Sequence, residues 1–183
     1  MKRALIVPPA PAPEALAELK QRLGLSGTRE DAALTRLIGA ALDLCEGFTG
    51  QVPLALTVEE LLPADGRWHR LSACPVQAVL ALEAVAANGA RTALVVEAYA
   101  IELDVDGGAR VRVVNPLRPG RVAVRFVAGL AAEWSALPES LRHGVIHLAA
   151  HQHRARETAS ADPVPPAAVT ALWRPWRIMR LAS

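Results

Sequence analysis

Hydrophobic and polar positions follow two different periods in the C-terminal half of the chain. Between residues 121 and 127, Val122, Val124 and Phe126 alternate with their neighbours, which predicts a β-strand with at least one buried face. From Pro138 onward the apolar period lengthens to that of an α-helix, and the proline stands where a missing N–H costs least. The helix reaches Glu157; one stripe carries Leu141, Val145, Leu148 and Gln152, and the opposite stripe carries His143, His147, His151 and Arg154. The pattern therefore predicts a strand followed by a long helix, with Leu148 on its buried side.

The N-terminal part of the chain predicts two more helices. Leucines at helical spacing and a terminal Gly24 predict a helix over residues 14–23. Thr28 and Asp31 resemble a capping box, with aspartate in place of glutamate, ahead of a second helix that ends near Phe48. Both helices therefore precede the region where the pattern changes.

Strands and turns dominate the middle of the chain. The predicted strands cover residues 54–58, 68–71, 79–85, 99–105 and 110–114, the last two joined by a turn at residues 106–108. Helical interpretations compete at residues 58–62 and 79–87, because alternation that is rich in alanine is weak evidence for a strand. Glu59 and Glu60 are expected at a solvated strand end.

Together these elements predict an α+β fold. Two N-terminal helices, one long C-terminal helix and one short helix at residues 167–172 form a helical bundle, with a small antiparallel β-sheet inserted at about residues 51–128. The predicted organisation is an extended arm over residues 1–13, a single domain over residues 14–157, and a C-terminal short helix and tail over residues 158–183.

Composition and charge exclude several classes of protein. The 183 residues carry a formal net charge of +2, which is too close to neutral to indicate nucleic-acid binding by itself. Cys45 and Cys74 have no zinc-site spacing and are expected to be reduced, buried thiols in a cytosolic product. The apolar run before the first prolines is too short to imply export, and no run approaches the length of a membrane span.

The sequence contains no nucleophile motif and no phosphate-binding loop. His143, His147 and His151 point to one side of the long helix, where two imidazoles could share a metal ion. However, the stripe contains no carboxylate and no HExxH motif, which favours a solvated or subunit-facing stripe without metal. We therefore expect no catalytic, cofactor or metal site, and a metal-dependent enzyme built on these histidines is the less favoured alternative.

The C-terminal stretch LWRPWRIMRLAS is the best candidate for an interaction site. Two tryptophans and three arginines occur there without an acidic residue, and both residue types are enriched in interface hot spots. No periodic apolar face accounts for Trp173 or Trp176, so both are expected to be exposed. Packing of the tail against the protein's own helices is the main alternative, and nucleic-acid contact through Arg174, Arg177 and Arg180 is a weaker one.

Several short motifs occur together in an order that resembles a known family. The first group is Phe126, Ala128 and Gly129, then Pro138, Glu139, Leu141 and Arg142, then Ala150, His151, Arg156 and Glu157. The second group is Leu34, Arg36, Leu37, Ile38, Ala40, Ala41, Phe48, Thr49 and Gly50, and the third is Leu172, Pro175, Trp176, Arg177, Arg180 and Leu181. These motifs resemble the head–tail connector (adaptor) proteins of tailed phages and gene transfer agents. One departure is His153, where that family often has a tyrosine.

The resemblance implies a structural protein rather than an enzyme. It implies a closed ring of about twelve copies beneath the portal of a phage or gene transfer agent particle, joining head to tail. The implied partners are the portal protein, neighbouring copies of the chain, and the next tail-side connector or stopper protein. DNA would pass through the channel without sequence-specific binding, and no membrane is involved. The particle would be assembled in the bacterial cytoplasm.

Within this interpretation the C-terminal tail docks on the portal. The candidate portal-binding residues are Trp173, Arg174, Pro175, Trp176, Arg177 and Arg180. Another head–tail joining layer, a stopper or a tail terminator, remains an alternative, although the long helices at both ends of the chain disfavour it. The sequence leaves open whether the particle is a phage or a gene transfer agent, and which residues face the channel.

Overall fold

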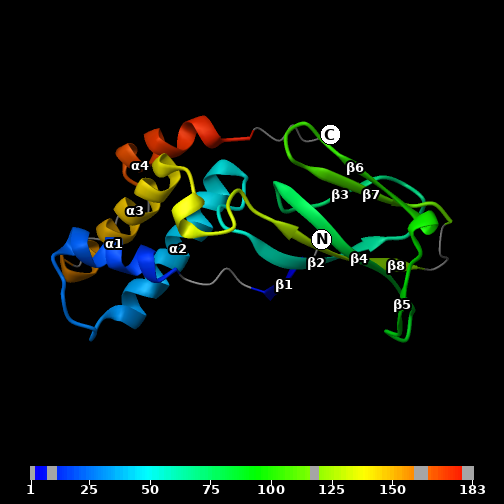
Figure 1. Ribbon diagram of the computed structural model, residues 1–183, viewed down its shortest axis with the longest axis horizontal. Helices are drawn as coiled ribbons and strands as arrows, with labels where there is room; N and C mark the ends of the chain where they lie inside the picture. The colour runs from blue at the N-terminus through cyan, green and yellow to red at the C-terminus, as the bar shows by residue number, and fades with distance from the viewer. Residues whose placement is uncertain (1–2, 8–11, 116–119, 159–164, 179–183) are drawn as a thin grey trace. The chain divides into compact units, whose positions relative to one another are not determined.

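The computed structural model describes residues 3–7, 12–115, 120–158 and 165–178 (Figure 1). The chain divides into two compact units, one helical and one of β-strands. The helical unit comprises residues 10–54 and 131–183, and the β unit comprises residues 1–9 and 55–130. Arg180 and residues 8–11 of the expected arm lie outside the described residues.

The helical unit contains the four predicted helices. They are α1 (Pro13–Leu23), α2 (Asp31–Thr49), α3 (Glu139–Thr158) and α4 (Ala167–Trp173), with the short 3₁₀ turns η2 (Trp134–Ala136) and η3 (Arg174–Trp176). Gly24 and Gly50 follow α1 and α2 in the left-handed conformation that ends a helix. The expected capping box is wrong: no side chain caps α2, and the N–H of Asp31 donates to the carbonyl oxygen of Thr28.

The apolar stripe of α3 is confirmed as a buried face. Leu141, Val145 and Leu148 are all buried, together with Leu34 and Ile38 of α2. Leucine, valine and isoleucine at helical spacing thus supply the core that the sequence pattern predicts. Cys45 lies in the same core, where burial, with a smaller contribution from Glu46, raises the pKa of its thiol to about 12. A thiol with that pKa stays protonated at neutral pH.

The β unit contains two antiparallel sheets (Figure 1). The five-stranded sheet has the order β1 (Arg3–Val7), β2 (Leu56–Pro63), β8 (Arg121–Ala128), β4 (Val76–Val85) and β5 (Arg91–Ala93). The three-stranded sheet has the order β3 (His69–Arg70), β7 (Ala109–Val113) and β6 (Tyr99–Leu103), with the 3₁₀ turn η1 (Val96–Ala98) before β6. Both segments with competing helical interpretations are strands, and the α+β class is confirmed.

Part of the expected N-terminal arm belongs to a sheet. Residues Arg3–Val7 form β1, which pairs antiparallel with β2 at the edge of the five-stranded sheet. The sequence suggested only an extended chain because a five-residue strand next to prolines gives no clear alternation.

The two faces of the five-stranded sheet differ in chemistry. Val58 pairs with Phe126, and both are fully buried. One residue further along, Glu59 pairs with Arg125, which places these charged side chains on the opposite face. The sheet therefore has one mostly apolar face, on which the carboxylate of Glu60 is also buried, and one face that carries ion pairs.

No helix in the described part of the chain combines the length and apolar character that a bilayer crossing requires.

Candidate docking surface at the C-terminal segment

Trp173 lies in the core of the helical unit. It is the last residue of α4 and has 0% exposed surface. Its indole packs on α3 at Gly144, where an added Cβ would lie 2.8 Å from the ring atom Cε2, and it lies 6.1 Å from the ring of Phe48. The indole N–H donates to the carbonyl oxygen of Leu141 at 3.4 Å. The expectation that Trp173 is exposed is therefore wrong.

The sequence signal for this burial is short but present. Val169 and Trp173 are four residues apart, and both are buried, so α4 has a narrow apolar face. Gly144 provides the complementary feature on α3, because only a residue without a side chain leaves room for the indole at that position. The alternative that the tail packs on its own helices therefore holds for Trp173.

The next residues are fixed along the ends of α2 and α3. The indole N–H of Trp176, a half-buried residue, donates to Ser140 Oγ at 2.8 Å. Its carbonyl oxygen accepts a hydrogen bond from Gln51 Nε2 at 2.5 Å, and the N–H of Ile178 donates to the carbonyl oxygen of Thr49 at 2.8 Å. These bonds hold η3 in one position on the helical unit.

Three residues of this segment face solvent. Arg174, Pro175 and Arg177 are exposed, and the guanidinium of Arg177 lies 5.7 Å from the ring centroid of Phe48, within the range of a cation–π contact. Together with the exposed edge of Trp176, they form a small basic and aromatic surface, which we name the η3 surface. A surface of this kind suits a polar or acidic partner protein.

The histidine stripe of α3 lies at the surface of the helical unit. His143 is exposed, His147 and His151 are half-buried, and the rings of His143 and His147 lie 4.5 Å apart. Within the residues that the structure describes, no three His, Cys, Asp or Glu side chains are arranged to hold a metal ion. Burial is the main reason that the pKa of His147 is lowered, and the cation of Arg22, whose Nη2 lies 3.1 Å from His147 Nδ1, adds to it.

A hollow of about 340 Å³ lies between α1 and α3. Its lining mixes both signs of charge: Glu18 lies 3.6 Å from Arg142 Nε and accepts a hydrogen bond from Trp134 Nε1 at 3.2 Å. Because its charged groups neutralise one another, the hollow does not select a ligand of either sign.

Glu59 and Glu60 are buried in the β unit, which the sequence did not predict. Both are buried, with 7% and 1% exposure, so the expected solvated strand end is wrong. Arg91 binds Glu59 through two hydrogen bonds of 2.8 Å, which are the main reason that the pKa of Glu59 is lowered. Glu60 accepts hydrogen bonds from the backbone N–H of Ser72 at 3.0 and 3.1 Å, and from its hydroxyl. Both carboxylates are thus structural.

Comparison with solved structures shows similarity over the whole chain. A chain in the neck of an empty gene transfer agent (GTA) particle with C6 symmetry is 31% identical, with a TM-score of 0.80, and the match covers 100% of this chain and 98% of that chain. A chain in the virion of a native gene transfer agent particle is 30% identical, with a TM-score of 0.77 and the same coverage. A chain in the neck of a native GTA particle with C12 symmetry is 28% identical, with a TM-score of 0.78 and again the same coverage.

No protein-family profile matches the chain, and no curated protein matches it by sequence. The family of this protein is therefore shown by its full-length similarity to solved structures. With 31% identity over its full length to a neck chain, this protein belongs to the family of structural proteins that build the neck, at the head–tail junction, of gene transfer agent particles.

Proposed function

We propose that this protein is the head–tail connector (adaptor) subunit, which forms a ring of about twelve copies beneath the portal. The observation that carries the proposal is the full-length similarity to a neck chain described with C12 symmetry. A closed ring needs one interface repeated around the axis, and a protein with this role needs no catalytic residues.

In this role the helical unit provides the rigid body and the η3 surface provides the docking contact. Arg174, Pro175, Trp176, Arg177 and Arg180 contact the portal protein. Trp173 contributes indirectly, because its burial against Gly144 fixes α4 and the segment that follows. Each contact is small, but a ring presents it many times at once, so the total affinity is high.

The other partners follow from the same position in the particle. The far side of the ring binds the next tail-side connector or stopper protein, and DNA passes through the channel without sequence-specific contacts. The particle is assembled in the bacterial cytoplasm.

Portal binding can be tested with charge-reversal variants of the full-length protein. The exposed arginines of the η3 surface are reversed in the double variant Arg174→Glu, Arg177→Glu. The matched control is Arg29→Glu, Arg36→Glu, which makes the same charge change at exposed positions elsewhere on the helical unit. Affinity for the cognate portal is measured by pull-down and by surface plasmon resonance at two salt concentrations.

We expect the η3 variant to lose at least about tenfold in affinity, as for the loss of a hot-spot contact, while the control binds like the wild type. Equal binding by both variants would remove the η3 surface from the proposal and leave the connector role. Failure of the wild-type protein to bind the portal, even at low salt, would overturn the connector role itself.

A second candidate is another joining layer of the neck, because a stopper or a tail terminator would also lie in the neck to which the matching chains belong. A stopper or a tail terminator would bind a neighbouring connector layer and would not capture the isolated portal. The same pull-down therefore separates the two candidates.

A further inference from the structure

A row of exposed apolar side chains follows the β6–β7 hairpin. Ile101 and Leu103 on β6 are 36% and 71% exposed, and Val105 in the turn is fully exposed. We name these three residues the hairpin edge. Contiguous apolar patches on a protein surface often mark an interaction site.

The hairpin edge continues a face that is buried one strand further in. Ile101 pairs with Val111 and Leu103 pairs with Ala109, and paired residues of antiparallel strands lie on the same face. Val111 and Ala109 are almost fully buried, whereas their partners on β6 are exposed. The apolar face of this sheet therefore extends from the buried strand β7 onto β6, where it is exposed in a single copy of the chain.

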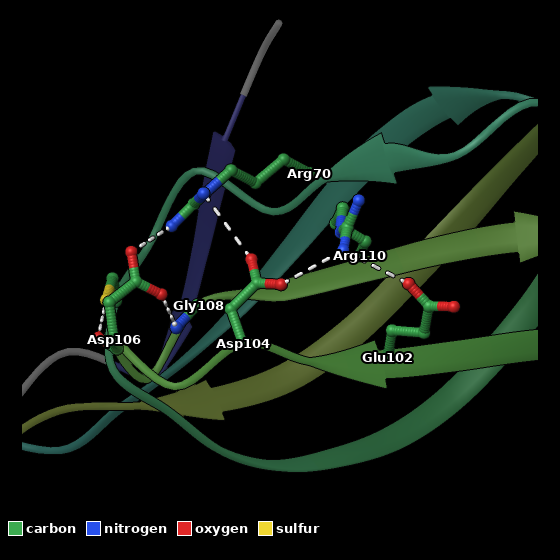
Figure 2. A network of polar contacts seen from close by, with 7 residues as sticks. Arg70, Glu102, Asp104, Asp106, Gly108 and Arg110 are labelled. Carbon is green, nitrogen blue, oxygen red and sulfur yellow. Dashed lines mark hydrogen bonds and ion pairs between the residues drawn. The ribbon is translucent and has the colours of Figure 1, made fainter. Parts of the chain in front are cut away.

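An ion-pair network holds the tip of the hairpin in place (Figure 2). Arg70 lies 2.6 Å from Asp106 and 3.4 Å from Asp104, and Arg110 lies 3.3 Å from Asp104 and 3.2 Å from Glu102. The N–H of Gly108 donates to Asp106 at 3.0 Å, and this bond is the main reason that the pKa of Asp106 is lowered. The network orders the turn that carries Val105 before any partner arrives, which lowers the entropy cost of docking.

The backbone of β6 is also available for pairing. β6 is the last strand of its sheet, and no described strand pairs with its outer edge. Proteins usually protect such an edge with charges, prolines or a covering segment, but Glu102 is the single charged residue in β6. An unprotected, apolar edge strand is a template for strand addition.

The same unit carries a second exposed edge of a different kind. β1 is one of the two outer strands of the five-stranded sheet, and its residues Leu5 and Ile6 are 49% and 45% exposed. We name these two residues the β1 edge. β6 carries Glu102 between its apolar residues, whereas Ala4, Leu5 and Ile6 of β1 are all apolar, so the two edges are unlike surfaces.

We propose that the hairpin edge of one copy docks on the β1 edge of the next copy, and that this contact closes the ring. The inference rests on the proposed ring function and identifies the surfaces that would form it. A ring requires two different complementary surfaces on each copy, whereas a twofold dimer requires one surface that matches itself. The β unit carries such a pair of unlike edges, and solved relatives occur in necks with C6 and C12 symmetry.

The test uses the full-length protein with one edge disabled at a time. One variant carries Leu103→Asp and Val105→Asp, and the other carries Leu5→Asp and Ile6→Asp. The matched control is Leu44→Asp, an exposed leucine of the helical unit. Assembly is measured by native mass spectrometry and negative-stain electron microscopy, with and without the cognate portal, and thermal unfolding checks that each variant is folded. Milder serine variants at the same positions replace any aspartate variant that unfolds.

We expect the wild type and the Leu44→Asp control to form rings and each edge variant to remain monomeric. A mixture of the two edge variants should give dimers and no larger species, because one intact hairpin edge can meet one intact β1 edge and nothing remains to extend the chain. This mixed dimer is the specific signature of the proposed contact.

The alternative outcomes are distinguishable. If the wild type forms no ring in either condition, the ring function fails and the inference fails with it. Normal rings from either edge variant would overturn the inference and leave the ring function intact. Loss of binding to another neck protein, with rings unchanged, would assign the hairpin edge to that partner instead.

Discussion

The helical unit and the β unit differ in how many of their large apolar side chains are exposed to solvent. Among the described residues, ten large apolar side chains are exposed; nine of them lie in the β unit, and only Leu44 lies in the helical unit. The large apolar side chains of the helical unit are thus almost all buried within a single copy, whereas several of those in the β unit are exposed.

The geometry of the elements explains the contrast. Each helix satisfies its own backbone hydrogen bonds and turns one apolar stripe inward, so a few helices can cover one another completely. An open sheet ends in edge strands, whose outer backbone groups have no partner within the sheet. The helical unit is therefore suited to be a rigid body, and the β unit is suited to contact other chains.

The largest expected effect is the loss of stability when the core of the helical unit is truncated at Trp173. Trp173→Ala should lower the free energy of unfolding by about 3–5 kcal/mol, because it removes a fully buried indole and leaves a cavity between α3 and α4. Urea unfolding followed by circular dichroism measures the change. The control is Arg174→Ala, one residue further and exposed, which should change stability by less than about 0.5 kcal/mol. A loss below about 1 kcal/mol for Trp173→Ala would contradict the packing of α4.

A smaller effect is expected from the buried carboxylate of the β unit. Glu60→Ala should cost about 1–3 kcal/mol, because it leaves the N–H and hydroxyl of Ser72 without the acceptor they have in the fold. Urea unfolding gives the free energy, and hydrogen exchange at the Ser72 amide reports the local change. Glu102→Ala is the matched control, since that carboxylate lies on the exposed β6 strand. Equal effects of the two substitutions would show that the buried hydrogen bonds of Glu60 do not contribute to the free energy of unfolding.

The smallest effect is a pH dependence in the helical unit. The pKa of His147 in the fold is below its usual value of 6.5, so the unfolded chain takes up the proton first as the pH falls. Stability should therefore be complete above the unfolded pKa of 6.5 and should decline as the pH falls below it, toward the lower pKa of the fold. Urea midpoints across this range measure the decline, and it should be weaker in His147→Asn, which does not titrate. The same slope in both proteins would assign the dependence to other groups.

Local patterns predicted most of the secondary structure. The α3 stripe with Leu141 and Leu148 and the alternation through Phe126 each depend only on residues close in sequence, and both are confirmed. The C-terminal segment was the candidate site, but its composition alone did not separate Trp173, which is buried, from Arg174, which is exposed. That distinction depends on Gly144, about thirty residues away in the sequence.

The sequence by itself determined the α+β class, the order of the elements and the resemblance to head–tail connector proteins, because periodicity and motif order are properties of neighbouring residues. The tertiary structure decided which of those residues are covered. It buried Glu59 and Glu60, brought Trp173 onto Gly144, paired the N-terminal segment as β1, and left the hairpin edge open. Burial depends on what packs against a residue from distant parts of the chain, and only the folded arrangement specifies that.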